Sequence, residues 1–224
     1  MLTHSRTPAL CPDGTSTAGD KATDHDSIGD CIENIVCLAG TELLEGATEC
    51  SPCSAGSYKA EATEGWSTQP PCLPCEAGRF TRTAGNAACE VCPAGTIATS
   101  EASTRCTKCA SGTYLEDDAH NHTYHDEATD CVPCSVGAFS PLKGRTEPCD
   151  TCEAGHVAVA EGSSECASCP SGRHLEDDAT DPTLHDDRND CVLCDEGLIS
   201  SDDRSSCDRC APGTEPSANR TRYS

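Results

Sequence analysis

The sequence predicts small disulfide-rich repeats that form an elongated rod of irregular loops and short β-hairpins, with little regular secondary structure. Leu, Ile, Val and Phe make up only about 12% of the 224 residues, and the net charge is -23. A chain below roughly 20% in these residues, with a high net charge, ordinarily buries too little apolar surface to fold. The 21 cysteines instead give the chain the cysteine content of a scaffold in which disulfides replace a hydrophobic core.

One motif, C-x2-C-x2-G-x-Φ with Φ a large or apolar residue, recurs along nearly the whole chain. Each recurrence opens a module, and Cys11 and Cys37 open two more modules that lack the pair but keep the glycine. The glycine is expected to provide a positive-φ turn or a close backbone approach. We expect Φ to be the side chain that packs over each module's disulfide. An array of this kind is a repeat protein in which each module contacts only its neighbours.

The cysteine spacing predicts the disulfides, because each module-opening cysteine can be joined to the next cysteine downstream. This rule gives ten bridges, Cys11–Cys31, Cys37–Cys50, Cys53–Cys72, Cys75–Cys89, Cys92–Cys106, Cys109–Cys131, Cys134–Cys149, Cys152–Cys166, Cys169–Cys191 and Cys194–Cys207. Cys210 is left free as the opening of a truncated module. Interlocked pairings remain an alternative, because spacing alone does not determine connectivity.

The loops between bridged cysteines come in two sizes, short ones such as Cys92 to Cys106 and long ones such as Cys109 to Cys131. From Cys89 the order of short and long loops repeats, beginning again at Cys149. The segment Leu115-Glu-Asp-Asp-Ala119 likewise returns as Leu175-Glu-Asp-Asp-Ala179. Duplication of a three-module block explains this period. The predicted organisation is a degenerate repeat at 1–36, linked repeats at 37–88, a three-module block at 89–148, its duplicate at 149–208 and a truncated repeat at 209–224.

The motif C-x2-C-x2-G-x-[FY], followed after a short loop by another C-x2-C, resembles the ephrin-receptor-like cysteine-rich repeat. That repeat is distantly similar in style to the cysteine-rich modules of tumour-necrosis-factor and growth-factor receptors. The resemblance extends over roughly Cys37 to Gly213, with the strongest copies at 75–112 and 134–172. It implies an extracellular, disulfide-stapled rod of a receptor or surface protein. No ligand-contacting residue of those receptors maps onto this chain.

Zinc is the main alternative use of the cysteines, because two C-x2-C pairs separated by loops of these lengths also suit a zinc ribbon. Such an array would be intracellular. Nine C-x2-C pairs cannot be divided into four-cysteine zinc sites without a remainder. Cys11 and Cys37, which lack the pair, are followed by glycine at the same spacing as the paired cysteines. Disulfides therefore explain the spacing better than zinc.

The long loops carry acidic residues and histidines in a repeated pattern. Calcium prefers six to eight oxygen ligands, whereas histidine together with carboxylates suits a transition metal. A solvated acidic loop copied by duplication explains the same pattern without any metal. The candidate metal ligands are Asp117, Asp118, His125, Asp126 and Asp130, with Asp177, Asp178, His185, Asp186 and Asp190 at the equivalent positions.

Asn121-His-Thr123 and Asn219-Arg-Thr221 are sequons for N-glycosylation, so Asn121 and Asn219 are expected to be modified in an exported glycoprotein. The chain shows neither a signal peptide nor a transmembrane segment, which leads us to expect part of a longer exported protein, extracellular or at the cell surface. The negative charge argues against nucleic acid and membrane partners and leaves extracellular proteins or glycans. No pattern predicts catalysis or a cofactor, apart from the calcium alternative. The expected role is a spacer, protein-interaction or adhesion module.

Overall fold

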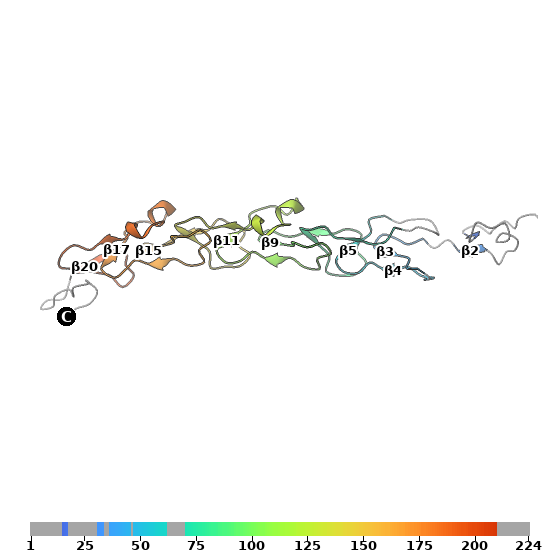
Figure 1. Cartoon of the computed structure of the whole chain (residues 1–224), viewed down its shortest axis with the longest axis horizontal. Coiled ribbons are helices and arrows are strands. Elements are labelled where there is room, and N and C mark those ends of the chain that lie inside the picture. The colour runs from blue at the N-terminus through green and yellow to red at the C-terminus, as the bar shows by residue number, and fades with distance from the viewer. Residues whose placement is uncertain (1–14, 18–30, 34–35, 46, 62–69, 210–224) are drawn as a thin grey trace, which may run out of the picture. The chain divides into compact units, whose positions relative to one another are not determined.

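The computed structural model describes residues 15–17, 31–33, 36–45, 47–61 and 70–209 (Figure 1). This part of the chain contains no α-helix and ten two-stranded antiparallel sheets. The chain divides into two units, one made of residues 1–76, 80–90 and 102–104 and the other of 77–79, 91–101 and 105–224. Small hairpins and nine disulfides confirm the predicted class of disulfide-rich repeat with little regular secondary structure.

Every hairpin joins two short strands that follow each other along the chain. The pairs are β1 (Thr15–Thr17) with β2 (Cys31–Glu33), β3 (Thr41–Glu42) with β4 (Ser51–Pro52), β5 (Ser57–Tyr58) with β6 (Leu73–Pro74), β7 (Arg79–Phe80) with β8 (Glu90–Val91), β9 (Thr96–Ile97) with β10 (Thr107–Lys108), β11 (Thr113–Tyr114) with β12 (Val132–Pro133), β13 (Ala138–Phe139) with β14 (Asp150–Thr151), β15 (His156–Val157) with β16 (Ala167–Ser168), β17 (Arg173–His174) with β18 (Val192–Leu193), and β19 (Leu198–Ser200) with β20 (Cys207–Arg209).

The hairpins explain why the motif needs two residues between its cysteines. In the module opened by Cys109, β11 follows Gly112 and pairs with β12, which consists of the two residues between Cys131 and Cys134. The first cysteine of the pair thus closes one module through its disulfide, and the second opens the next. One two-residue strand therefore joins each disulfide to its successor.

Nine disulfides link the described cysteines, each with a Cα–Cα distance of 5.6 to 5.9 Å. They are the nine bridges from Cys37–Cys50 to Cys194–Cys207 that the spacing rule gives. Cys210 and the bridge Cys11–Cys31 lie outside the part of the structure in which side chains are described. Zinc requires thiolate ligands, and these eighteen cysteines are all oxidised, so the zinc alternative is overturned for them.

Neighbouring modules are joined by a repeated set of backbone hydrogen bonds. The N–H of Gly112 donates to the carbonyl of Ser140 at 2.7 Å, and the N–H of Leu115 donates to the carbonyl of Arg145 at 3.0 Å. The carbonyl of Gly112 in turn accepts from the N–H of Cys134 at 2.9 Å. With so little apolar surface available, these bonds satisfy the backbone at each junction and fix how one module follows the next.

The prediction that modules contact only their neighbours is wrong, because a loop also reaches back to the module two positions before its own. The loop of the Cys152–Cys166 module donates from Gly162 N–H to the carbonyl of Cys134, 2.8 Å away in the preceding module. The carbonyl of Gly162 then lies against Gly112, one module further back. A loop with a sequence separation of 14 is long enough for this, since an extended chain spans about 3.3 Å per residue.

Apart from the module-opening cysteines, the most consistently buried side chain from the Cys53 module onward is the residue after Φ, and this corrects the expected role of Φ. The residues after Φ are at most 8% exposed, namely Lys59, Thr81, Ala98, Leu115, Ser140, Ala158, Leu175 and Ser200. Φ itself is buried at Phe80, Val157 and Ile199 but only half-buried at Tyr58, Ile97, Tyr114 and Phe139. From Lys59 to Leu175 this residue is held inside because its backbone bonds to both adjoining modules. At Ser200 the side-chain hydroxyl instead accepts from the N–H of Gly172 in the preceding module. Where Φ is buried at Val157, it packs with Cys169 and Cys191, the disulfide of the following module.

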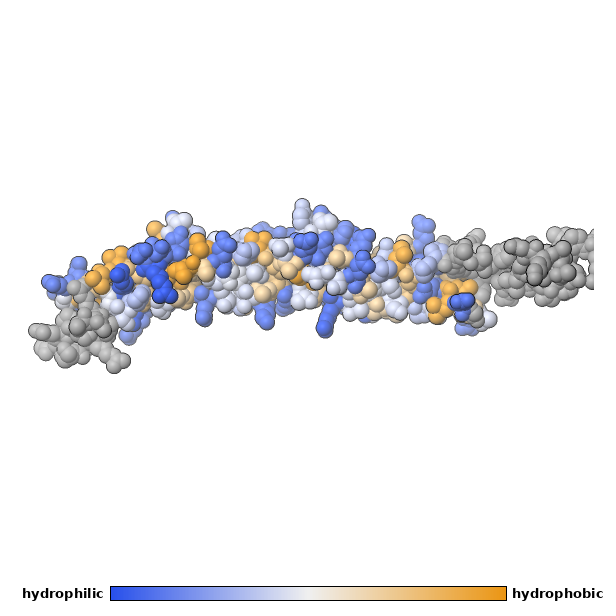
Figure 2. Space-filling model, viewed as in Figure 1, coloured by the Kyte–Doolittle hydropathy of each residue, from blue (hydrophilic) through white to orange (hydrophobic). Residues whose placement is uncertain are grey.

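The long loops of the second unit each contain two 3₁₀ turns, visible in Figure 1 as small coils. These turns are η3 (His122–Tyr124) and η4 (Ala128–Asp130) in one loop, and η5 (Pro182–Leu184) and η6 (Arg188–Asp190) in the other. In the described part of the chain no helix has the length and apolar character needed to cross a bilayer. On the face shown in Figure 2, hydrophobic residues form separate spots between hydrophilic side chains.

Candidate functional site

The long loop between Cys109 and Cys131 holds a buried pair, His125 and Asp117. The side chain of His125 is 0% exposed and that of Asp117 only 8% exposed. Nε2 of His125 lies 2.9 Å from Oδ1 of Asp117, and Nδ1 of His125 lies 2.7 Å from the carbonyl oxygen of Thr96. The turn η3 places His125 here, because the His125 N–H caps it by donating to the carbonyl of His122.

The contacts of His125 determine where its protons lie. A carbonyl oxygen can only accept, so Nδ1 must carry a proton that it donates to Thr96. With Nδ1 protonated, the contact between Nε2 and Asp117 is attractive only if a second proton lies between these two atoms. The pair therefore combines an imidazolium and a carboxylate, or their neutral forms, and in either state it buries no net charge.

The duplicate loop contains the equivalent pair, His185 and Asp177, with the same burial of 0% and 8%. Nδ1 of His185 lies 2.7 Å from the carbonyl oxygen of His156, which corresponds to Thr96. Nε2 of His185 lies 2.7 Å from Oδ2 of Asp177, although the two atoms are not aligned for a hydrogen bond. We interpret this contact as the same ion pair, because its distance is no longer than the aligned contact of His125.

Two further carboxylates of the predicted metal set, Asp118 and Asp178, are exposed and accept local hydrogen bonds. The N–H of His120 donates to Asp118 at 3.1 Å, which lowers the pKa of that carboxyl. The hydroxyl of Thr180 donates to Asp178 at 2.6 Å and lowers its pKa, and the Thr180 N–H adds to the effect. The pKa of His120 is raised, chiefly by the hydrogen bond between its Nδ1 and the Asp118 carbonyl.

The other members of the predicted set shape the 3₁₀ turns or follow the buried histidines. Asp130 and Asp190 close capping boxes by accepting from the backbone N–H of Glu127 and Asp187, each at 2.8 Å. The remaining two, Asp126 and Asp186, directly follow the buried histidines and are half-buried.

These candidate metal ligands are not gathered around a common point. Among the residues that the structure describes, only His174, Cys194 and Cys207 place three ligand atoms of the metal-binding type within 4.8 Å of one another. Cys194 and Cys207 are joined in a disulfide, so neither offers a thiolate. Sequence reasoning did not single out His174, which stands where most modules carry a large apolar Φ.

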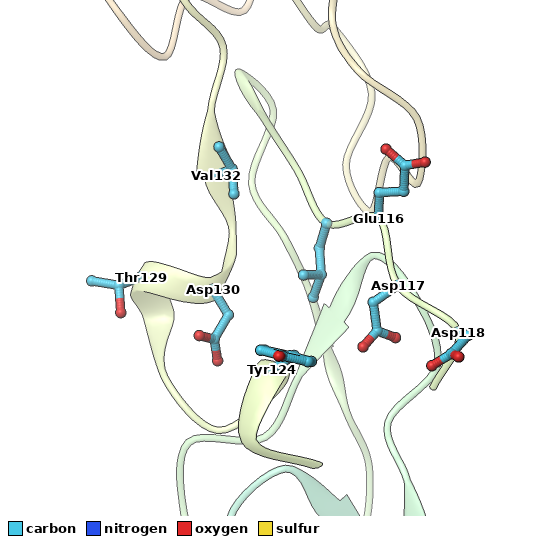
Figure 3. Close-up of a pocket in the computed structure, with 8 residues that line it drawn as sticks. Glu116, Asp117, Asp118, Tyr124, Thr129, Asp130 and Val132 are labelled. Carbon is cyan, nitrogen blue, oxygen red and sulfur yellow. The ribbon is translucent and has the colours of Figure 1, made fainter. Parts of the chain in front are cut away.

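An acidic groove of about 800 Å³ lies beside the His125–Asp117 pair. Figure 3 shows Tyr124 and Asp130 on one side of the groove, and Asp117 and Asp118 on the other. The lining residues are Leu115, Glu116, Asp117, Asp118, Tyr124, Thr129, Asp130 and Val132, without any lysine or arginine. The groove therefore combines carboxylates with an exposed aromatic ring and the exposed side chain of Val132, a composition suited to a cation that carries apolar groups.

The sequon at Asn121 is exposed at the start of η3. Its side-chain oxygen accepts hydrogen bonds from the N–H and the hydroxyl of Thr123, at 3.1 and 3.0 Å. In the duplicate loop Asp181 takes the same position and accepts from Thr183, so only the first loop carries a sequon. Asn219 lies outside the described residues.

Hairpins joined end to end by C-x2-C pairs, each module closed by its own disulfide, define a cysteine-rich repeat protein of the extracellular type, since such disulfides persist in oxidising compartments. Within this class, residues 63–109 match the family model of tyrosine-protein kinase ephrin type A/B receptor-like repeats. The comparison with curated proteins gave no match. The matched segment ends before the acidic groove begins, so the groove is a feature of this chain outside the family match.

Proposed function

We propose that the chain is a non-catalytic extracellular repeat region of a surface or receptor-like protein and that it acts as a spacer and protein-interaction or adhesion module. The observation that carries this proposal is the disulfide in every described module from Cys37 to Cys207. Covalent loops supply the stability that so few apolar residues cannot, and they persist only outside the reducing cytosol.

The placement of the ionisable side chains supports a binding role over a catalytic one. Within the described chain the buried ionisable pairs, His125 with Asp117 and His185 with Asp177, are engaged with each other and with backbone carbonyls. Exposed carboxylates and scattered apolar side chains are instead available on the surface for contacts with other proteins. Glycosylation of Asn121 fits an exported chain, and we propose it as part of the same function.

The test is the intact mass of the exported, non-reduced chain, measured with and without alkylation. Ten disulfides would lower the mass by about 20 hydrogens and leave one alkylatable thiol, following the pairing of all cysteines but Cys210. Beads coated with this material should then bind to cells, whereas beads coated with reduced and alkylated chain should not. Many reactive thiols that appear only when metal is stripped would overturn the extracellular assignment. Equal binding by both sets of beads would overturn the interaction role.

A further inference from the structure

We propose that the acidic groove of the first long loop docks an arginine or lysine side chain of a partner protein, together with an apolar residue next to it. The inference rests on the proposed interaction function and names its recognition chemistry. The groove is formed by Leu115 to Asp118 on one side and by residues between Tyr124 and Val132 on the other.

Charge complementarity identifies the first part of the occupant. Glu116, Asp117, Asp118 and Asp130 all line the groove, and the lining contains no lysine or arginine that could neutralise them. Asp118 and Asp130 accept hydrogen bonds only from neighbouring backbone N–H groups and the exposed His120. Besides Asp117, which His125 already engages, a cation from another molecule would find three carboxylates within one cavity, which favours a positively charged side chain over an acidic or neutral one.

A separate observation points to a missing hydrogen-bond donor. Oδ2 of Asp117 is buried and has no hydrogen-bond partner in the described chain, whereas Oδ1 of the same carboxylate pairs with His125. A buried carboxylate oxygen without a donor is unfavourable, so a small shift of Asp117 that brings Oδ2 to a donor of the ligand would be stabilised. A guanidinium carries five N–H donors in a planar fork and can bond to a carboxylate while it keeps its other contacts.

Apolar groups of the groove identify the second part of the occupant. Tyr124 is 58% exposed and Val132 is 42% exposed, while Leu115, which also lines the groove, is buried. The face of an aromatic ring attracts a cation within about 6 Å, and its edge packs with apolar side chains. A volume of about 800 Å³ lies within the range of small-ligand sites, which accommodates one long side chain and part of its neighbour.

The duplicate loop provides a natural comparison. It keeps Glu176, Asp177, Asp178 and Asp190 but has Leu184 in place of Tyr124, with Val192 at the position of Val132. The two loops therefore share the carboxylates but not the aromatic ring. Because the ring contributes a cation–π attraction, the first loop should bind a cationic side chain more tightly than the second.

The experiment is an NMR titration of the ¹⁵N-labelled, disulfide-intact chain with the peptide acetyl-Gly-Arg-Leu-Gly-amide at low salt. The control peptide carries citrulline in place of arginine, which keeps the shape of the side chain and removes its charge. The expected result is a set of chemical-shift changes centred on residues 115–132 with the arginine peptide only. Tyr124→Ala should weaken binding about threefold to fivefold, and Leu184→Ala in the duplicate loop should leave it unchanged.

Several outcomes would overturn the inference. They are equal shifts with the citrulline peptide, shifts centred outside the groove, no shifts at millimolar peptide, or displacement of the peptide by millimolar calcium with calcium bound in its place. A chain that has its disulfides and binds cells, yet fails this titration, would refute the groove inference alone. A chain that lacks its disulfides would refute the proposed function first.

Discussion

Nε2 of His125 lies 2.9 Å from Oδ1 of Asp117, while the other ring nitrogen of His125 bonds to Thr96 in the preceding module. The carbonyl of His125 also accepts from the N–H of Ala98 at 2.8 Å. One buried histidine thus ties its loop to the preceding module through both its ring and its backbone. The carboxyl group of Asp117 orients the ring.

Replacing Asp117 should show how strongly the attachment of this loop to the preceding module depends on the carboxyl group. Asp117→Ala leaves Nε2 of the buried imidazole without a partner and should cost about 3–5 kcal/mol. Asp117→Asn can donate from its amide to a neutral Nε2, so its cost should be only about 1 kcal/mol. Hydrogen exchange of the Ala98 N–H measures the local opening free energy, with Gly162 in a distant junction as the control. Equal losses for the two variants would contradict the proposed role of the carboxylate.

The contact between Gly112 and the loop of the module after next predicts a specific steric effect. Gly112 has φ of +81° and a Cβ there would collide with the carbonyl of Gly162, whereas Gly197 has φ of +83° and open space around it. Gly197→Ala should therefore cost only the left-handed strain of about 1–2 kcal/mol. Gly112→Ala should cost clearly more, and denaturant unfolding of both variants would measure the difference. Similar losses would mean that the loop contact contributes nothing.

The hydrogen bonds of Asp203 predict how the stability of the last described loop depends on pH. Its carboxylate accepts from the hydroxyl of Ser201 at 2.7 Å and from the N–H and hydroxyl of Ser205, which lowers its pKa to about 2. Because the folded pKa lies below the ordinary value of 3.8, the stabilisation is complete above about pH 4. It is lost as the pH falls through the folded pKa of about 2.

The measurement is an NMR titration of the Asp203 carboxyl carbon in the unmodified chain and in Ser205→Ala. Removing the Ser205 hydroxyl should raise the pKa of Asp203 toward its ordinary value. The pKa of Asp150, which is held low by a bidentate hydrogen bond from Arg145, should not change. An unchanged Asp203 in the variant would show that the hydroxyl does not hold the carboxylate.

Chelation tests the calcium and transition-metal alternatives for the long loops. His125 and Asp117 bind each other and Asp130 caps a turn, so stability should not depend on a bound ion. We expect the melting temperature of the disulfide-intact chain to be the same in excess EDTA and in millimolar calcium. A rise of several degrees with calcium, abolished by Asp118→Asn, would instead place a cation in the loop.

The sequence predicts the disulfides and hairpins because both are local. Each described bridge closes a sequence separation of only 13 to 22, and in the eight hairpins from β3–β4 to β17–β18 the second strand is the x2 of a C-x2-C pair. The burial of the residue after Φ could not be predicted, because it follows from backbone bonds between modules. The pairing of His125 with Asp117 could not be predicted either, since the same two residue types also suit a metal. The sequence does repeat both residues in the duplicate loop, as His185 and Asp177. This repetition indicates that the two residues act together, but it does not distinguish an ion pair from a set of metal ligands.

Because each loop lies against a glycine two modules earlier, only some insertions of modules preserve the contacts between them. A module's environment depends on the loop lengths of the two modules that follow it, and from Cys92 to Cys207 these lengths run short, long, short, short, long, short. Inserting one or two modules would bring a loop of the wrong length against a glycine such as Gly112. Copying three modules together is the smallest duplication that places a loop of the original length against every glycine. This matches the return of the block that begins at Cys89 at Cys149.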